Sequence, residues 1–482
     1  MGIETEQNIE KKIMETGYCD FHFHWEKDEW YPDGSFRNTG RAIRNPIELL
    51  FQDYAGNLFV RAESFPYKNK WEFLSVCVEN EMAAYELAQP YFKKFSGEKS
   101  LETLVDGFKI LYEMPELDMS DRKQYVELSL RVKAAYKDGI LKHLPGAYRK
   151  AGIVRSINIW TSRYAREHFD NLTEENKQLE LKFLPATFRF DYALVLPFRY
   201  RRDFAIAKWF LEFVQDINGL PVIPLRKPWE MSQIHIREIN RYLKSISFDE
   251  YLVFLDKAFD YFASRGVSQM KSACCFARTV EFREREEKDA RKAFNKLQSE
   301  FLDSQDMDFE ETLRVFEDFI FFRCINMARD RKWQTIQIHT GHKGKDIETS
   351  RPALLEEVIA KNPDMNFILL HGGKHYYNEV LDLCARYKNA IADFTWIPLL
   401  EPELGRKMAK AFISEFPYRT VAGLDMANIE GSAGMAHSNK KLIAEILNEL
   451  LKEKKISSMD EAYAIGKSVI NAKPKELFPL SF

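Results

Sequence analysis

Short apolar runs rich in β-branched residues recur along this sequence, and stretches with helical periodicity separate each run from the next. That alternation is typical of parallel strands joined by helices. The runs predicted as strands are Tyr18 to His24, Ile153 to Thr161, Asp191 to Phe198, Val267 to Ala273, Thr335 to His339, Asn366 to His371, Ala390 to Thr395 and Thr420 to Asp425. Because eight is the strand number of a closed barrel, the sequence predicts an α/β fold, the (β/α)8 TIM barrel.

Two intervals between the predicted strands are too long for a bare barrel. The interval after the first strand contains amphipathic helices at Trp71 to Phe95 and Leu101 to Met114, so we expect a helical insertion over residues 25–149 that caps the barrel mouth. The interval between Phe198 and Val267 also holds more than one helix. No long repeat or Pro/Ser-rich linker divides the sequence, and we therefore interpret residues 1–482 as one barrel domain that contains the insertion.

Composition limits the class of partner. The chain is 45% hydrophobic and 30% charged, which allows a large core and excludes disordered and collagen-like proteins. Its net charge of −3 offers no bulk attraction for nucleic acid or an anionic membrane. The polar first residues do not resemble a signal peptide, and the scattered cysteines fit reduced thiols. We expect a cytoplasmic enzyme with a small-molecule substrate and neither a nucleic-acid nor a membrane partner; a homo-oligomer stays open.

Residues that commonly bind metal ions stand where the predicted strands end, which is where barrel enzymes place their active sites. His22 and His24 end the first strand, and alternation along a strand turns both to one face. His339, His371 and Asp425 end the fifth, sixth and eighth strands. An isolated His-x-His pair is explained as well by two structural histidines. Three further ligand-type residues at successive strand ends make a metal site the better interpretation.

This order of residues resembles the amidohydrolase superfamily of metal-dependent hydrolases, in its amidohydrolase-related branch. The segments QIHTGHKGKDIETSRPALLEEVI, FILLHGGKHYYNEVLDLCARYKNAIADFTWIPLL and INAKPKELF are most similar to the amidohydrolase domains fused to glutamine-synthetase-like proteins. A looser resemblance to uronate isomerase rests on the chain length and the insertion. The residues after Asp425, MANIEGSAGM, do not match the Arg-containing strand 8 motif of that family.

The resemblance implies one or two divalent metal ions. The implied ligands are His22, His24, Lys271, His339, His371 and Asp425. In this superfamily a lysine at the position of Lys271 can be carbamylated and bridge two metals, whereas the alternative is an ordinary strand-end ion pair. Imidazole with carboxylate suits zinc best, and ligand type leaves manganese, iron and nickel open. The guanidinium of Arg278 suits a substrate carboxylate, although a structural ion pair explains this residue equally well.

The predicted function is metal-dependent hydrolysis of an amide, lactone or similar acyl bond through a metal-activated hydroxide, with Asp425 as the catalytic residue that carries the proton. The same barrel supports other chemistry, because function belongs to the site rather than to the fold. A mononuclear metal-dependent decarboxylase and a uronate-isomerase-like sugar-acid isomerase therefore stay open. A non-catalytic protein with a relict metal site is disfavoured by the intact ligand set.

Overall fold

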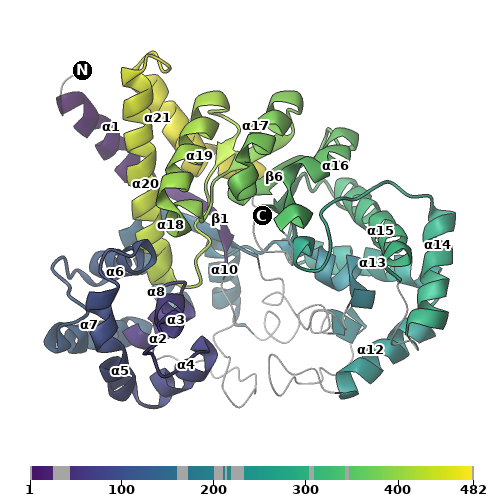
Figure 1. The fold of residues 1–482 in the computed structure, drawn as a ribbon, viewed down its shortest axis with the longest axis horizontal. Helices are drawn as coiled ribbons and strands as arrows, with labels where there is room; N and C mark the ends of the chain where they lie inside the picture. Colours follow the sequence, from purple (N-terminus) through teal and green to yellow (C-terminus); the bar gives the residue numbers. More distant parts are fainter. Residues whose placement is uncertain are drawn as a thin grey trace. The chain divides into compact units, whose positions relative to one another are not determined.

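The computed structural model describes residues 3–24, 44–159, 172–199, 210–211, 214–215, 217–218, 233–302, 309–341 and 347–479 (Figure 1). The chain forms two compact units. The first comprises Met1–Asn158, Thr173–Pro185 and Asp393–Glu476, and the second comprises Ile159–Leu172, Ala186–Ala392 and Leu477–Phe482. All six cysteines are buried with free thiols, as expected from the sequence. Among the described helices, none is both long enough and apolar enough to cross a bilayer.

The first unit contains the first two strands and the last one. β1 (Tyr18–Phe23) pairs in parallel with β2 (Ile153–Asn158), and β8 is Thr420–Val421. Every residue of β1 is buried, which explains why this run is almost wholly apolar apart from Asp20 and His22. The other helices of this unit outside the insertion are α1 (Ile3–Glu15), α10 (Glu174–Phe183), α18 (Ile397–Leu400), α19 (Pro402–Glu415), α20 (Ile429–Lys452) and α21 (Met459–Lys467), with α22 (Lys473–Leu477) closing the helical part of the chain.

Between β1 and β2 the described chain is helical, as predicted for the insertion. Its helices are α2 (Pro46–Gln52), α3 (Gly56–Arg61), α4 (Lys70–Glu79), α5 (Glu81–Lys94), α6 (Lys99–Tyr112), α7 (Arg122–Tyr136) and α8 (Ile140–Ala151). The expected start of the insertion, residues 25–43, lies outside the described residues. An aromatic cluster fills the interior of this region, with the Phe51 ring centroid 4.4 Å from that of Phe73 and 5.3 Å from that of Phe59.

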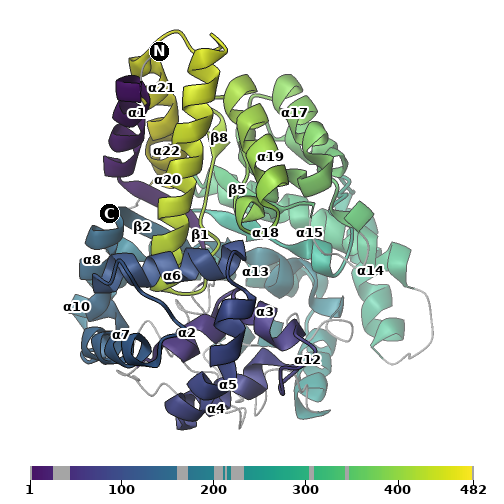
Figure 2. The same cartoon turned by 60° about the vertical axis from the view of Figure 1, so that its left-hand side comes forward.

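Helix α6 of the insertion crosses α20 at very close range (Figure 2). A Cβ atom built on Gly107 would lie 1.8 Å from the carbonyl oxygen of Glu430, and one built on Gly434 would lie 1.7 Å from that of Thr103. Only glycine lets the two backbones meet at this distance. The insertion is therefore seated directly on the helix that follows β8.

The second unit contains a parallel sheet in which neighbouring strands follow the chain order. Its strands are β3 (Phe188–Arg189), β4 (Met270–Ser272), β5 (Thr335–His339), β6 (Asn366–Leu370) and β7 (Ala390–Asp393), whose first three residues belong to this unit. Its α-helices with described bounds are α12 (Gln233–Ser245), α13 (Phe248–Ala263), α14 (Glu287–Lys296), α15 (Glu310–Asp330), α16 (Glu356–Lys361) and α17 (Tyr377–Arg386). Helices α13, α14 and α15 pack beside one another, as Figure 1 shows in teal and green.

The third strand lies earlier in the chain than the sequence predicts. The run from Asp191 to Phe198 is not a strand: Asp191–Val195 forms a π-helical turn, and Pro197–Arg199 forms a 3-10 turn. The carboxylate of Asp191 accepts hydrogen bonds from the Ala273 backbone N–H at 2.5 Å and from the Ser272 hydroxyl at 3.1 Å. These bonds hold the chain in a turn just after β3, so an apolar run that could have been a strand is helical instead.

Candidate metal centre

Two histidines stand at the carboxyl end of β1. His22 is part of the strand and is 1% exposed, and His24 is the first residue after the strand. The backbone N–H of His24 donates to the carbonyl of Met426 at 2.9 Å, and that of Asp425 donates to the carbonyl of His22 at 2.8 Å. The end of β1 is therefore bonded to the segment that follows β8, which brings Asp425 to the two imidazoles.

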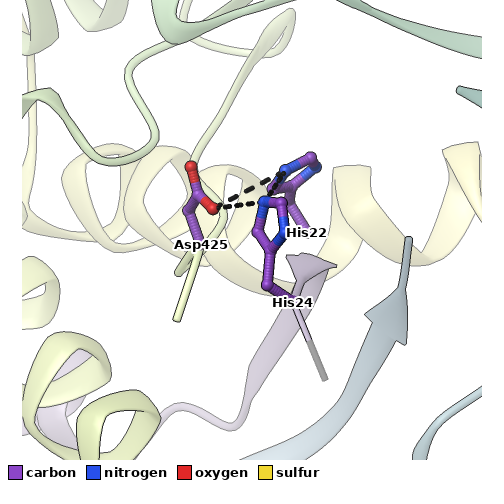
Figure 3. A group of neighbouring side chains, drawn as sticks. All are labelled: His22, His24 and Asp425. Carbon is purple, nitrogen blue, oxygen red and sulfur yellow. Dashed lines mark hydrogen bonds and ion pairs between the residues drawn. The ribbon is translucent and has the colours of Figure 1, made fainter. Parts of the chain in front are cut away.

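The three side chains point toward a common position (Figure 3). The Asp425 Oδ1 atom lies 2.8 Å from His24 Nε2 and 3.7 Å from His22 Nε2, and the two Nε2 atoms are 3.3 Å apart. A tetrahedral ion with bonds of about 2 Å keeps its ligand atoms about 3.3 Å apart. Two imidazole nitrogens and a carboxylate oxygen at these separations fit a divalent metal ion in both spacing and donor chemistry.

The backbone of Asp425 adopts an uncommon conformation. Its φ is 54°, in the left-handed region that residues with a Cβ rarely occupy. Such conformations cost about 1 kcal/mol or more and persist where the surrounding structure holds them. Here the hydrogen bond to His22 holds the residue, and the turn directs the carboxylate at the imidazoles.

Asp20 supports this arrangement from within the strand. Its Oδ1 atom accepts hydrogen bonds from the backbone N–H of His22 at 3.0 Å and from that of Leu424 at 2.9 Å. Burial raises the pKa of this carboxyl to about 7. Asp20 was not among the site residues predicted from the sequence, although its position two residues before His22 on the same strand was a signal for it.

Tyr54 connects the insertion to the candidate site. Its hydroxyl donates to Asp425 Oδ1 at 3.2 Å, and its ring centroid lies 5.2 Å from that of Trp396. Tyr54 follows α2 and is half-buried. No spacing in the sequence indicates this contact, because it joins a turn of the insertion to a residue after the last strand.

The other predicted ligands belong to the second unit. Lys271 lies in β4, in register with Arg189 on one side and Gln337 on the other, and is 1% exposed. His339 ends β5, and His371 directly follows β6 with a φ of 65°. The two imidazole centroids are 4.4 Å apart in an edge-to-face contact. Sequence order thus placed this histidine pair together, while the carbamylation of Lys271 and the membership of these residues in one metal centre stay predictions.

The guanidinium of Arg278 is engaged by groups of the protein. Its side chain donates to Glu317 at 3.0 Å, to Asp318 at 2.8 Å and to the carbonyls of Thr279 and Glu281. These contacts match the structural ion pair that the sequence analysis held open. Arg278 as a substrate-binding residue stays a prediction.

One family model matches part of the chain. A family model described as amidohydrolase matches residues 294–422. This segment contains His339 and His371 and the strands from β5 to β8. No curated protein sequence matches the chain.

Solved structures match nearly the whole chain. A uronate isomerase from Thermotoga maritima is 14% identical with a TM-score of 0.69, and the match covers 99% of this chain and 98% of that one. A glucuronate isomerase from Caulobacter crescentus is 13% identical with a TM-score of 0.69, covering 98% and 94%. A structure from Lactobacillus casei ATCC 334, named for a metal-dependent hydrolase, is 12% identical with a TM-score of 0.53, covering 96% and 95%.

At these identities the likeness shows the fold, and it confirms the predicted (β/α)8 barrel. The resemblance predicted from the sequence is confirmed: an amidohydrolase family model matches residues 294–422, and the chain shares its barrel fold with the uronate isomerases.

Proposed function

We propose that the protein is a metal-dependent hydrolase that cleaves an amide, lactone or similar acyl bond of a small molecule. The observation that carries this proposal is the convergence of His22, His24 and Asp425, with three donor atoms separated by 2.8 to 3.7 Å. Two neutral imidazoles and one carboxylate are typical ligands of catalytic zinc, and we propose zinc as the ion.

A divalent ion at such a site lowers the pKa of water and polarises a carbonyl group. The chain supplies the groups that move the proton. Asp425 is both a ligand and the general base, so its carboxylate takes a proton from water and delivers it to the leaving group. The Tyr54 hydroxyl, 3.2 Å from Asp425 Oδ1, holds this carboxylate in the orientation that the transfer requires.

In a form of the site with two metal ions, the further ligands would be Lys271, His339 and His371. A carbamate on Lys271 would supply two anionic oxygens, which offset the repulsion between neighbouring cations. The burial of Lys271 supports the modification, because a buried charge needs an oppositely charged partner, and a carbamate would have one in the metal ions. We further propose that the protein is cytoplasmic and has neither a nucleic-acid nor a membrane partner. Both a monomer and a homo-oligomer are compatible with this proposal.

A sugar-acid isomerase is the second candidate. The fold similarity to the Thermotoga maritima uronate isomerase covers almost the full length of both chains and favours it. The residues after Asp425, MANIEGSAGM, count against isomerisation, because they do not match the Arg-containing strand 8 motif of the uronate isomerases.

The experiment that tests the proposal is metal analysis combined with a substrate screen. We expect the purified protein to contain zinc and to hydrolyse members of a panel of acyl amides and lactones, with activity lost on chelation and restored by zinc. His22→Ala is expected to lose metal and activity, whereas the control His437→Ala, on α20, keeps both. Isomerisation of glucuronate without acyl hydrolysis would refute the hydrolase proposal, and activity in metal-free protein would refute any metal mechanism.

A further inference from the structure

One side chain of the first unit links the ends of two helices close to the candidate metal centre. Asn428 directly precedes α20, and its Oδ1 atom accepts a hydrogen bond from the backbone N–H of Gly431 at 2.7 Å. Its Nδ2 atom donates to the carbonyl of Leu49, in the last turn of α2, at 2.9 Å. The first bond caps the start of α20, as asparagine commonly does. The second bond joins that start to the end of α2.

The turn after α2 carries Tyr54 and is packed tightly against the helix. The Leu49 carbonyl that the amide binds also accepts from the backbone N–H of Asp53 at 3.2 Å. Gly56 begins α3, and a Cβ built on it would lie 2.7 Å from the Cα atom of Phe51 in α2. Only glycine allows the backbone to fold back this closely. Tyr54 therefore follows the position of the end of α2.

The same turn lies against the first turn of α20. A Cβ built on Gly431 would lie 2.4 Å from the Oδ2 atom of Asp53, so the glycine leaves the space that the Asp53 carboxyl occupies. Asp53 is fully buried and directly precedes Tyr54. The start of α20 thus meets the turn in two places, through the amide of Asn428 and through the close approach of Asp53 to Gly431.

The contact that this arrangement supports tolerates little displacement. The Tyr54 hydroxyl donates to Asp425 Oδ1 at 3.2 Å, and a separation of about 3.6 Å is too long for a hydrogen bond. A shift of about half an ångström at the end of α2 is therefore enough to break the bond. Asp425 and Asn428 belong to one short segment after β8. That segment carries both the carboxylate and the amide that fixes the helix leading to its tyrosine.

We propose that Asn428 is a positioning residue for the reaction, which holds the Tyr54 hydroxyl on Asp425 through the end of α2. This inference rests on the proposed hydrolase function, in which Asp425 carries the proton. Asn428 acts through backbone groups of the two helices, and its amide is bonded to Leu49 and Gly431. Its loss should therefore change the rate of proton transfer and leave the metal ligands in place.

The test removes the Nδ2 donor and keeps the helix cap. Asn428→Asp preserves the size of the side chain, Asn428→Ser introduces no charge, and both replacements are good capping residues. Asn45→Asp and Asn45→Ser are the matched controls, because Asn45 is 7% exposed and Asn428 is 6% exposed. Asn45 caps α2 by accepting from the Glu48 N–H at 2.8 Å, and it donates to the Cys77 carbonyl at 2.9 Å. It links α2 to α4 instead of to the segment after β8.

Two measurements are made on each variant. Fluorotyrosine is incorporated in place of Tyr54, and its fluorine NMR resonance reports the surroundings of the ring without any substrate. Turnover is measured with zinc-loaded protein that carries the ordinary tyrosine and with the acyl amides and lactones of the screen. We expect both Asn428 variants to shift the resonance and to lower kcat about tenfold, with KM and zinc content retained. The Asn45 variants should leave the resonance and kcat unchanged.

A double variant separates this role from a general loss of stability. Tyr54→Phe combined with Asn428→Ser should lower kcat no further than Tyr54→Phe alone, because both changes break the same contact. Losses that multiply would overturn the inference, as would an unmoved resonance in the Asn428 variants or an equal loss of kcat in the Asn45 variants. Asn428 variants that fail to fold while the Asn45 variants fold would also overturn it, because Asn428 would then support the whole fold.

The two measurements also distinguish this inference from the proposed function. If the resonance moves in the Asn428 variants but the native protein hydrolyses no acyl substrate, the hydrolase proposal fails and the positioning of Tyr54 stands. If acyl substrates are hydrolysed at a rate that does not depend on Asn428, the positioning role fails and the hydrolase proposal stands.

Discussion

Replacing Gly107 by alanine is expected to push the insertion away from α20. The new methyl carbon would lie 1.8 Å from the Glu430 carbonyl oxygen and 2.7 Å from the carbonyl carbon, whereas real Cβ atoms essentially never lie within 3.0 Å of another heavy atom. The obstacle is backbone inside a helix, so no side-chain rotation relieves it. The helices must separate by more than an ångström, and the close packing along the crossing is lost.

The magnitude follows from two opposed effects. Overpacking of a tight contact costs about 1 to 3 kcal/mol, and a backbone obstacle places this case at about 3 kcal/mol. Alanine in place of glycine inside a helix raises the free energy of unfolding by about 1 kcal/mol, because alanine has the higher helix propensity. The separation also strains the hydrogen bond from the Tyr112 hydroxyl on α6 to the Glu430 side chain, which is 2.6 Å long, and a hydrogen bond of this kind contributes about 1 kcal/mol. We expect a net loss of about 3 kcal/mol in the free energy of unfolding.

Urea unfolding followed by circular dichroism measures this loss. Gly146→Ala is the matched control, because Gly146 also lies inside a helix of the insertion and nothing is within 4 Å of the Cβ that alanine would add. The control should be slightly more stable than the native protein, by about 1 kcal/mol or less. If Gly107→Ala is as stable as Gly146→Ala, the two helices do not meet at this crossing and the reasoning is wrong.

Three further predictions concern the candidate site and its surroundings. Lys271→Ala is expected to halve the metal content measured by elemental analysis if a carbamate bridges two ions, and unchanged content would exclude that role. Tyr54→Phe should lower kcat about tenfold with metal content retained, because the hydrogen bond that orients Asp425 is lost; an unchanged kcat would contradict this role. Burial raises the pKa of Asp53 from 3.8 to about 7, so the stability that this carboxyl contributes is complete below about pH 4 and is lost as the pH rises through 7. Asp53→Asn should therefore unfold less readily than the native protein at pH 8, by up to about 4 kcal/mol in urea titrations, with little difference at pH 4. If the free energies of unfolding of the native protein and Asp53→Asn change with pH in the same way, Asp53 does not titrate as described.

The sequence predicts strands well where both faces of a strand are buried. Thr335–His339 is predicted with the bounds that the structure shows, because a short run enclosed on both sides has to be apolar throughout. The third strand is misplaced because Asp191, a single buried polar residue, turns the chain at the start of an otherwise strand-like run. Local patterns do not reveal the partner 82 residues away that makes this turn.

The same distinction applies to the candidate site. Strand alternation and strand order are enough to bring His22, His24 and Asp425 together. Tyr54 could not be found, because its contact with Asp425 depends on how the insertion packs against the segment after β8. Likewise, Arg278 was ambiguous in the sequence because its partner Glu317 lies on a helix 39 residues further along the chain.

The three donor atoms of Figure 3 come from positions 22, 24 and 425, near opposite ends of the chain. Bringing such distant residues together costs a chain of this length about 5 kcal/mol of loop-closure entropy. A partly folded or truncated chain that has not joined the end of β1 to the segment after β8 lacks the complete donor set. An ion would therefore bind at this position only in chains that have completed this part of the fold. Its binding would in turn stabilise the folded state relative to partly folded chains.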